Sequence, residues 1–129
     1  MTHEYTLLGA PITKKNSMQI LRAANGRAFI APSKQYKAYE KDCIRQLADR
    51  RKPRIATPVN VRCVYYMPTR RKVDLCNLLG ATCDILIAAG VLEDDNSTIV
   101  VSHDGCCVRY DKTNPRVEVF VEDVVCEAK

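Results

Sequence analysis

The 129-residue sequence is poor in aromatic residues, with no tryptophan and two phenylalanines, and it also lacks a long apolar run. No stretch approaches the ~18 apolar residues that a membrane-spanning helix requires. The first 30 residues contain no apolar segment between a basic stretch and a small-residue cleavage site, so we expect no signal peptide. Low-complexity stretches and internal repeats are also absent. We therefore expect a cytoplasmic protein without a membrane partner, folded as one domain over residues 1–129.

The cysteines include no pair with the Cys-x-x-Cys spacing of common zinc sites. Two of them, Cys106 and Cys107, are adjacent and cannot easily bind one zinc ion with tetrahedral geometry. An odd number of cysteines without a secretion signal favours reduced thiols. We expect most of them to be small core residues. The seven cysteines are Cys43, Cys63, Cys76, Cys83, Cys106, Cys107 and Cys126.

The net charge of +5 is modest, but its distribution is uneven. Basic residues cluster at Lys14-Lys15, at residues 50–54 and at residues 70–72, whereas acidic residues gather at residues 93–95 and near the C-terminus. A basic run is most often a solvated surface. The run at 70–72 differs, because an acidic motif follows it directly, and it therefore favours contact with a polyanion.

Hydrophobic periodicity predicts an α+β fold, in which a mixed β-sheet is combined with two main helices. Tyr36, Tyr39, Cys43 and Leu47 form one apolar stripe of a first helix that begins after the N-cap Ser33. The second helix begins at Asp74 and stops at Gly90. We expect strands at 4–12, 59–67, 98–102 and 116–121, helices at 34–50 and 74–89, and a hairpin turn at Asn25-Gly26.

The segment from Met67 to Val100 combines features that phosphodiester hydrolysis requires. A strand ends at Pro68, the basic run 70–72 follows, and Asp74 stands where the next helix begins. After that helix, the sequence continues through Gly90 to Asp94-Asp95. Carboxylates bind Mg²⁺, usually one or two of them together with water and phosphate oxygens. A bound metal polarises the phosphate and activates water, and neighbouring arginines hold the DNA backbone.

These residues resemble the RusA family of endodeoxyribonucleases, whose signature is a basic turn, Asp-Leu-Asp-Asn, a helix, a glycine and then Asp-Asp. Residues 70–77 are Arg-Arg-Lys-Val-Asp-Leu-Cys-Asn, and Asp84, Gly90 and Asp94-Asp95 follow in register. The resemblance extends over residues 4–122. It implies a single RusA-like domain that forms a homodimer and nicks four-way DNA junctions symmetrically. It also implies Mg²⁺ as the cofactor, with Mn²⁺ as a substitute, and branched DNA rather than a small molecule as the substrate.

The resemblance also assigns roles to individual positions. Asp74 and Asp95 match two catalytic aspartates, and Asp84 and Asp94 are available to rebuild the site. Asp74, Asp94 and Asp95 are the candidate metal ligands. The candidate DNA-binding residues are Arg70, Arg71, Lys72, Lys14, Lys15 and Asn77.

Two positions depart from the family pattern. Cys76 replaces the middle aspartate, and Gly80 replaces a lysine. A thiolate is a poor Mg²⁺ ligand, so Cys76 does not stand in for a carboxylate. Three interpretations remain open: a divergent nuclease with a rearranged site, a junction-binding protein that cuts weakly or not at all, and a structural or protein-interaction domain.

Each candidate aspartate also has a purely structural interpretation. Asp74 suits the N-cap of a helix, and Asp94-Asp95 suits a polar turn. Asp84 lies roughly 20° from Asn77 around the helix, and we expect it to face the site or pair with an arginine, because an unpaired buried carboxylate is costly. Asp95 can approach Asp74 only if the chain after Gly90 folds back along the helix, or if a second subunit completes the cluster. Both arrangements predict burial of residues 91–95.

Overall fold

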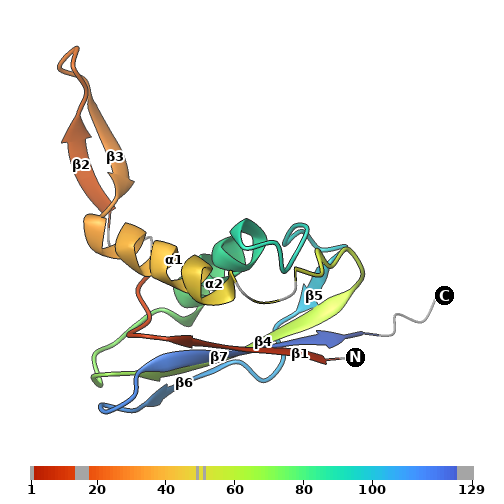
Figure 1. Ribbon diagram of the computed structural model, residues 1–129. Coiled ribbons are helices and arrows are strands. Elements are labelled where there is room, and N and C mark those ends of the chain that lie inside the picture. The colour runs from red at the N-terminus through yellow and green to blue at the C-terminus, as the bar shows by residue number, and fades with distance from the viewer. Residues whose placement is uncertain (1, 14–17, 49, 51, 125–129) are drawn as a thin grey trace.

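The computed structural model describes residues 2–13, 18–48, 50 and 52–124, and two helices lie over one mixed β-sheet (Figure 1). This arrangement confirms the predicted α+β fold class. The elements in chain order are β1 (Thr2–Leu8), β2 (Met18–Arg22), β3 (Ala28–Pro32), α1 (Lys34–Leu47), β4 (Val59–Met67), α2 (Leu75–Ala88), β5 (Val100–Ser102), β6 (Cys107–Tyr110) and β7 (Arg116–Asp123).

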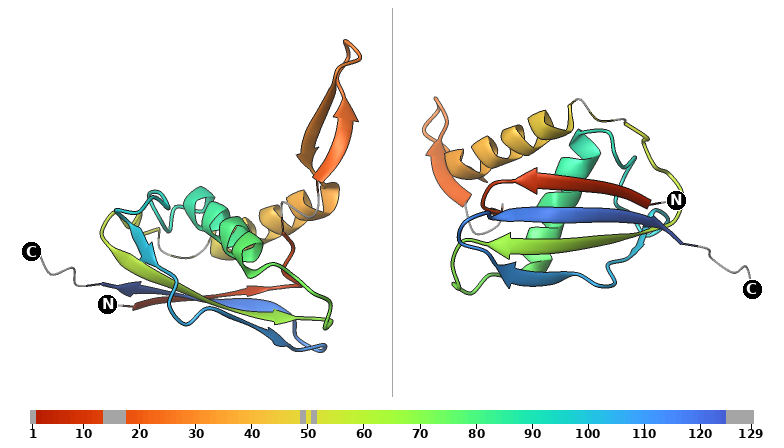
Figure 2. Two further views of the ribbon diagram at one scale, coloured as in Figure 1. Left: turned by 180° about the vertical axis from the view of Figure 1, so that it is seen from behind. Right: turned by 60° about the horizontal axis from the view of Figure 1, so that its bottom comes forward.

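The main sheet is built around β4. On one side, β4 pairs antiparallel with β7, which pairs antiparallel with β1 at the sheet edge. On its other side, β4 pairs in parallel with two short strands in succession, β5 near its start and β6 near its end. Figure 2 shows this sheet from below, with α2 crossing behind it. The residues between β5 and β6 therefore leave the sheet edge midway along β4.

Both helices cover the same face of the sheet, and the core lies between the two layers (Figures 1 and 2). Alternate residues of β7 point into it, because successive side chains of a strand face opposite sides. The predicted stripe of α1 is confirmed, since its four residues are all buried. The Ser33 hydroxyl accepts a hydrogen bond from the Tyr36 backbone N–H at 3.1 Å and caps the helix as expected. Tyr65 of β4 is fully buried and bonds to Thr82 of α2 at 2.7 Å between the side-chain oxygens.

The other face of the sheet carries arginine side chains stacked on aromatic rings. The Arg62 guanidinium lies 3.9 Å from the ring centroid of Phe120, and that of Arg116 lies 3.8 Å from the ring centroid of Tyr66. Arg116 also pairs with Asp111 and Glu118. Stacking of this kind covers the apolar rings while the charged groups remain near water.

A second, two-stranded sheet, β2–β3, projects away from the body beyond α1 (Figure 1). Its turn contains Asn25-Gly26 as predicted, and Gly26 adopts a φ of 84°. Such a conformation carries no steric cost for glycine. Within the described residues, no helix is long and apolar enough to cross a membrane.

Several predicted boundaries were wrong. β1 ends at Leu8 rather than residue 12, because Gly9 turns the chain with a φ of 112°. α1 ends at Leu47, β5 begins at Val100, and β6 was not predicted. All described cysteines are free thiols, as expected, but Cys76 is exposed rather than part of the core. Cys126 lies outside the described residues.

Candidate active site

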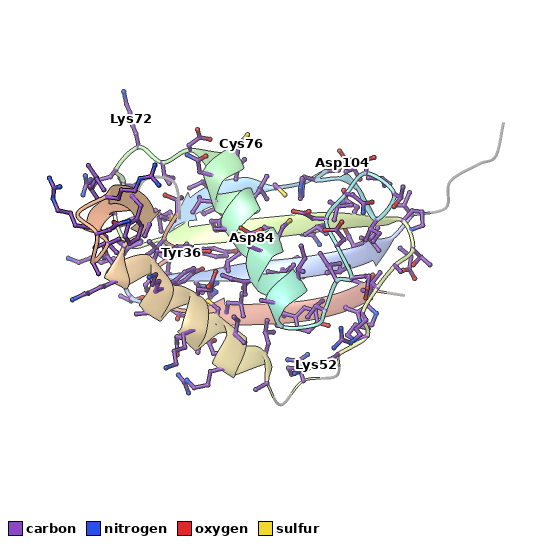
Figure 3. All side chains as sticks on the ribbon, turned by 90° about the horizontal axis from the view of Figure 1, so that it is seen from above. Tyr36, Lys52, Lys72, Cys76, Asp84 and Asp104 are labelled. Carbon is purple, nitrogen blue, oxygen red and sulfur yellow. The ribbon has the colours of Figure 1, made fainter. Side chains whose placement is uncertain are left out.

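Asp74 caps the N-terminus of α2. Its Oδ1 accepts a hydrogen bond from the Cys76 backbone N–H at 2.9 Å, and its main-chain oxygen accepts from Asn77 and Leu78 at 3.1 Å. The structural interpretation of Asp74 as an N-cap is therefore confirmed. The carboxylate is nevertheless exposed, so the cap does not remove it from contact with a ligand. Figure 3 shows Cys76 at this end of α2, in the first turn after the loop that carries Lys72.

The chain reverses direction after α2. Gly90 adopts a φ of 80°, and the backbone N–H groups of Val91 and Leu92 both donate to Leu86 O, at 2.9 and 3.3 Å. Val91 and Leu92 are buried. The following residues, 93–95, are exposed, so the predicted burial of the whole segment 91–95 was wrong. Burial of Val91 and Leu92 stabilises the turn after α2, whereas the acidic side chains of residues 93–95 remain in contact with water.

The reversal brings Asp95 to the face of α2 that carries Cys76. A pocket of about 280 Å³ lies between them, and it is open to solvent on one side. Its lining residues are Cys76, Leu79, Gly80, Cys83, Asp95 and His103. Asp95 and Cys76, which are about 20 positions apart in sequence, thus line one pocket within a single chain. This is the fold-back arrangement of the chain after Gly90. The positions of the two family departures, Cys76 and Gly80, both line this pocket.

Asp84 and Asp94 lie elsewhere. Asp84 is exposed rather than buried, and it lies roughly 80° around α2 from Cys76. Burial is the main cause of the raised pKa of Tyr36 in α1, the nearby Glu40 adds to it, and the Asp84 charge contributes further. Asp84 is therefore near α1, midway along α2 in Figure 3. Asp94 is also exposed, and Asn96 donates to its Oδ2 at 2.7 Å, which lowers the pKa of that carboxyl group.

The basic turn before α2 lies beside two open hollows. The Arg70 guanidinium stacks over Tyr110 of β6, 4.3 Å from the ring centroid. Arg71 lines a hollow with Arg70 and Tyr110, and a second one with Lys72 and residues 10–13. Lys72 extends outward from the loop (Figure 3). Arg71 and Lys72 are exposed and Asn77 is half-buried. Lys14 and Lys15 lie outside the described residues.

His103, which sequence reasoning left without a role, lies in the same pocket as Asp95. Its Nδ1 is 2.8 Å from Val61 O of β4. Hydrogen bonds with the thiols of Cys106 and then Cys83 raise the pKa of His103 to about 10, which favours the imidazolium form. In the sequence, the one indication of a role for His103 was its position just after the predicted strand 98–102. A single histidine at such a position does not show which residues surround it.

The cysteine partner of His103 is also perturbed. The Cys63 backbone N–H donates to Cys106 Sγ at 3.2 Å. Interaction with the Cys63 side chain and then with His103 lowers the pKa of Cys106 to about 5. Hydrogen bonds and a cation stabilise a thiolate in this way. A negative Cys106 and a positive His103 stabilise each other beside the pocket.

The acidic residues do not form a pre-assembled metal cage. Within the described part of the chain, no group of three or more histidine, cysteine, aspartate or glutamate side chains could hold a metal ion by itself. Mg²⁺, however, usually needs only one or two carboxylates, with water and substrate phosphate completing its shell. Asp95, which lines the pocket, fits that mode of binding, in which substrate and metal bind together. Asp74 caps the helix two residues before Cys76 but is not among the lining residues.

An α+β protein with an exposed aspartate in a pocket beside a basic turn has the features of a metal-dependent DNA nuclease. Residues 9–122 match the family Endodeoxyribonuclease RusA. The chain therefore belongs to the RusA family of endodeoxyribonucleases. Membership implies nuclease activity of the Holliday-junction resolvase kind, binding of branched DNA and dependence on a divalent metal ion. No match was found among curated proteins.

Proposed function

We propose that this protein is a Mg²⁺-dependent endonuclease that resolves four-way DNA junctions by paired nicks, with residues 1–129 as its single domain. The observation that carries the proposal is the pocket along α2, where Asp95 approaches Cys76 and Gly80. The basic turn lies immediately before this helix, at the end that carries Cys76. Mn²⁺ should substitute for Mg²⁺.

In this proposal, Asp95 and Asp74 are the principal metal-binding carboxylates, and Asp94 is a third candidate. When bound, the metal would polarise the scissile phosphate and lower the pKa of the attacking water. Asp84 is the least supported catalytic candidate, because it lies near α1 and does not line the pocket. The exposed carboxylates repel phosphate in the absence of metal, so the cation should strengthen DNA binding at the pocket.

The activity is tested with a synthetic four-way junction and a linear duplex of matched sequence, each with Mg²⁺, Mn²⁺ or EDTA. Metal-dependent nicking of the junction, at symmetric positions and without cleavage of the duplex, is the expected result.

A second candidate function is a junction-binding protein without cleavage. The thiol of Cys76 in the pocket favours it, as does the lack of a metal-holding group among the described residues. Tight junction binding without cleavage in either metal would select that function. Weak binding insensitive to salt would instead indicate a structural domain.

We also propose that the working form is a homodimer. Paired nicks across a two-fold symmetric junction require two active sites related by a two-fold axis, and closed dimers of this kind are the commonest oligomers. Multi-angle light scattering at micromolar concentration should therefore give twice the chain mass of 14.5 kDa. A single-chain mass at that concentration would contradict the proposal.

Arg70 and Arg71 should hold DNA phosphates. Replacing both with alanine should weaken junction binding. It should also flatten the slope of log affinity against log salt concentration by about one to two units, because fewer counterions are released when fewer phosphates are contacted. Fluorescence anisotropy at several salt concentrations measures this slope. Arg45→Ala, at an exposed position of α1, is the matched control and should leave the slope unchanged. An unaltered slope in the double variant would remove the two arginines from the DNA interface.

Cys76→Asp should increase Mg²⁺-dependent cleavage. Cys76 is exposed, lines the pocket with Asp95 and lies in a first helical turn that contains no acidic residue. A carboxylate there adds a hard metal ligand and interacts favourably with the helix N-terminus. Cys76→Ser, which removes the thiol without adding charge, is the control. Equal rates for the aspartate and serine variants, with both folded, would show that the metal binds elsewhere.

A further inference from the structure

We propose that His103 contacts the scissile phosphate, donating a hydrogen bond from Nε2 to a phosphate oxygen in the pocket that it shares with Asp95. The inference rests on the proposed nuclease function and adds a residue to its site. Two observations support it. His103 lines the same pocket as residues of α2, and the hydrogen bond between its Nδ1 and Val61 O orients the imidazole ring.

The backbone that carries His103 is held in a defined conformation. Residues 103–106 form the excursion between β5 and β6, and Asn60 of β4 binds them on both sides. Its Oδ1 accepts from the Asp104 backbone N–H at 2.7 Å, and its Nδ2 donates to Asp104 O at 3.1 Å. Gly105 has a φ of 86°, and a Cβ there would lie 2.5 Å from the Arg62 side chain. The positive φ favours glycine at this position, and the two hydrogen bonds of Asn60 hold the turn that carries His103.

The imidazole ring is oriented by its first nitrogen. Val61 O can only accept a hydrogen bond, so Nδ1, 2.8 Å away, must carry a proton. Nε2 is then the ring nitrogen that is available to the sulfurs of Cys106 and Cys83 and to the pocket, which Cys83 also lines. Hydrogen bonds with the sulfurs of Cys106 and then Cys83 raise the pKa of the ring to about 10, so that both ring nitrogens carry a proton at neutral pH. A protonated ring fixed in this way is a preorganised donor for an anion.

The pocket has room for a phosphate beside this donor. A Cβ built on Gly80 would meet no atom within 4 Å, so no packing contact requires glycine at this position. Glycine inside a helix is less favourable than alanine, but here the missing side chain leaves space beside α2 in the pocket. Of the lining residues that the structure describes, His103 alone can carry a positive charge. A phosphate entering beside Asp95 would therefore meet one cationic side chain within the pocket.

Two substitutions separate the ring nitrogens. Asparagine can retain the hydrogen bond of Nδ1 to Val61 O but supplies no donor at the position of Nε2, whereas glutamine places a neutral amide donor near that position. We expect His103→Asn to lower the cleavage rate by about 10²–10³-fold, the usual effect of removing one preorganised donor. His103→Gln should lose less. Junction affinity in EDTA should change by less than about threefold, because most of the affinity comes from the many phosphate contacts elsewhere.

The matched control is His3→Asn, since His3 is the other histidine of the chain and lies on β1, at the opposite edge of the sheet. It should cleave at the parent rate. A His103→Asn variant that cleaves at the parent rate would overturn the inference, and so would an equal loss in the asparagine and glutamine variants.

A second measurement needs no variant and no catalysis. In NMR spectra of the ¹⁵N-histidine-labelled parent protein, the ring signals of His103 should shift when metal-free four-way junction is added in EDTA, and those of His3 should not. If His103 does not shift at saturating junction, the inference is wrong. If His103 shifts and the parent protein never cleaves, the phosphate contact stands and the proposed nuclease activity fails. The two failures are therefore distinguishable.

Discussion

Asp95→Asn should lower Mg²⁺-dependent cleavage of a four-way junction by about 10³-fold, since losing ~4 kcal/mol of metal-derived transition-state stabilisation corresponds to three powers of ten in rate. Among the described residues that line the pocket, Asp95 is the only one with a carboxylate. The asparagine side chain keeps the size of aspartate but removes the charge that a metal ion requires. The rate is measured under single-turnover conditions with enzyme in excess.

The fold should tolerate this change. Asp95 is exposed, and surface substitutions usually alter the free energy of unfolding by less than about 0.5 kcal/mol. Glu93→Gln is the matched control, because it removes the same charge from an exposed position two residues away whose side chain does not line the pocket. The control should cleave at the parent rate. Equal activity of the two variants would show that the pocket is not the active site, whereas equal loss would indicate a general effect of charge.

The parts of the fold that depend on local pattern could be predicted from the sequence. The apolar stripe of α1 and the alternation in β7 follow from periodicity alone, because each element buries one face. The Ser33 and Asp74 caps follow from the preference for short polar side chains before a helix. The length argument left two arrangements open, a return of the chain along α2 or a second subunit, and the structure shows Asp95 lining a pocket with Cys76 of the same chain.

The remainder of the site depends on long-range pairing that local pattern does not reveal. β6 has four residues, and its side chains are mostly exposed, so it carries almost no periodic signal. It exists because Val64 of β4 pairs with Cys107, 43 positions later in the sequence. The excursion of residues 103–106, and with it the position of His103, is a consequence of that pairing. Because β6 was not predicted, nothing in the sequence indicated which residues surround His103.

For Asp84, the angle around α2 relative to Asn77 was not enough to predict the surroundings of the side chain. The prediction that it shares a side of α2 with Asn77 follows from 100° per residue and holds. Which side of the helix is buried depends on where α1 packs. The structure buries Leu78, Ile85 and Leu86 instead and leaves Asp84 exposed near Tyr36. Asp84 does not line the pocket, so the alternative in which it faces the site is not supported.

Asp74→Asn should separate the two roles of Asp74. Asparagine caps a helix about as well as aspartate, so the hydrogen bond from the Cys76 backbone N–H is retained and the melting temperature should stay near that of the parent. The negative charge that would bind Mg²⁺ is lost, so cleavage should fall by two orders of magnitude or more, about 3 kcal/mol in activation free energy. Junction affinity in EDTA should hold or increase, because a charge that repels phosphate has been removed.

Asp74→Ala completes this comparison, because it removes both the charge and the cap. It should cut as slowly as the asparagine variant and also lose about 1 kcal/mol of stability from the missing cap, a fall in melting temperature of roughly 4 °C for a chain of this size. Cleavage rate, junction affinity and melting temperature are measured for each variant on one preparation. If Asp74 is only a cap, asparagine cuts at the parent rate and alanine loses activity only in proportion to its loss of folded protein. Parent-level cleavage by Asp74→Asn would thus exclude Asp74 from metal binding and leave Asp95 as the central carboxylate of the site.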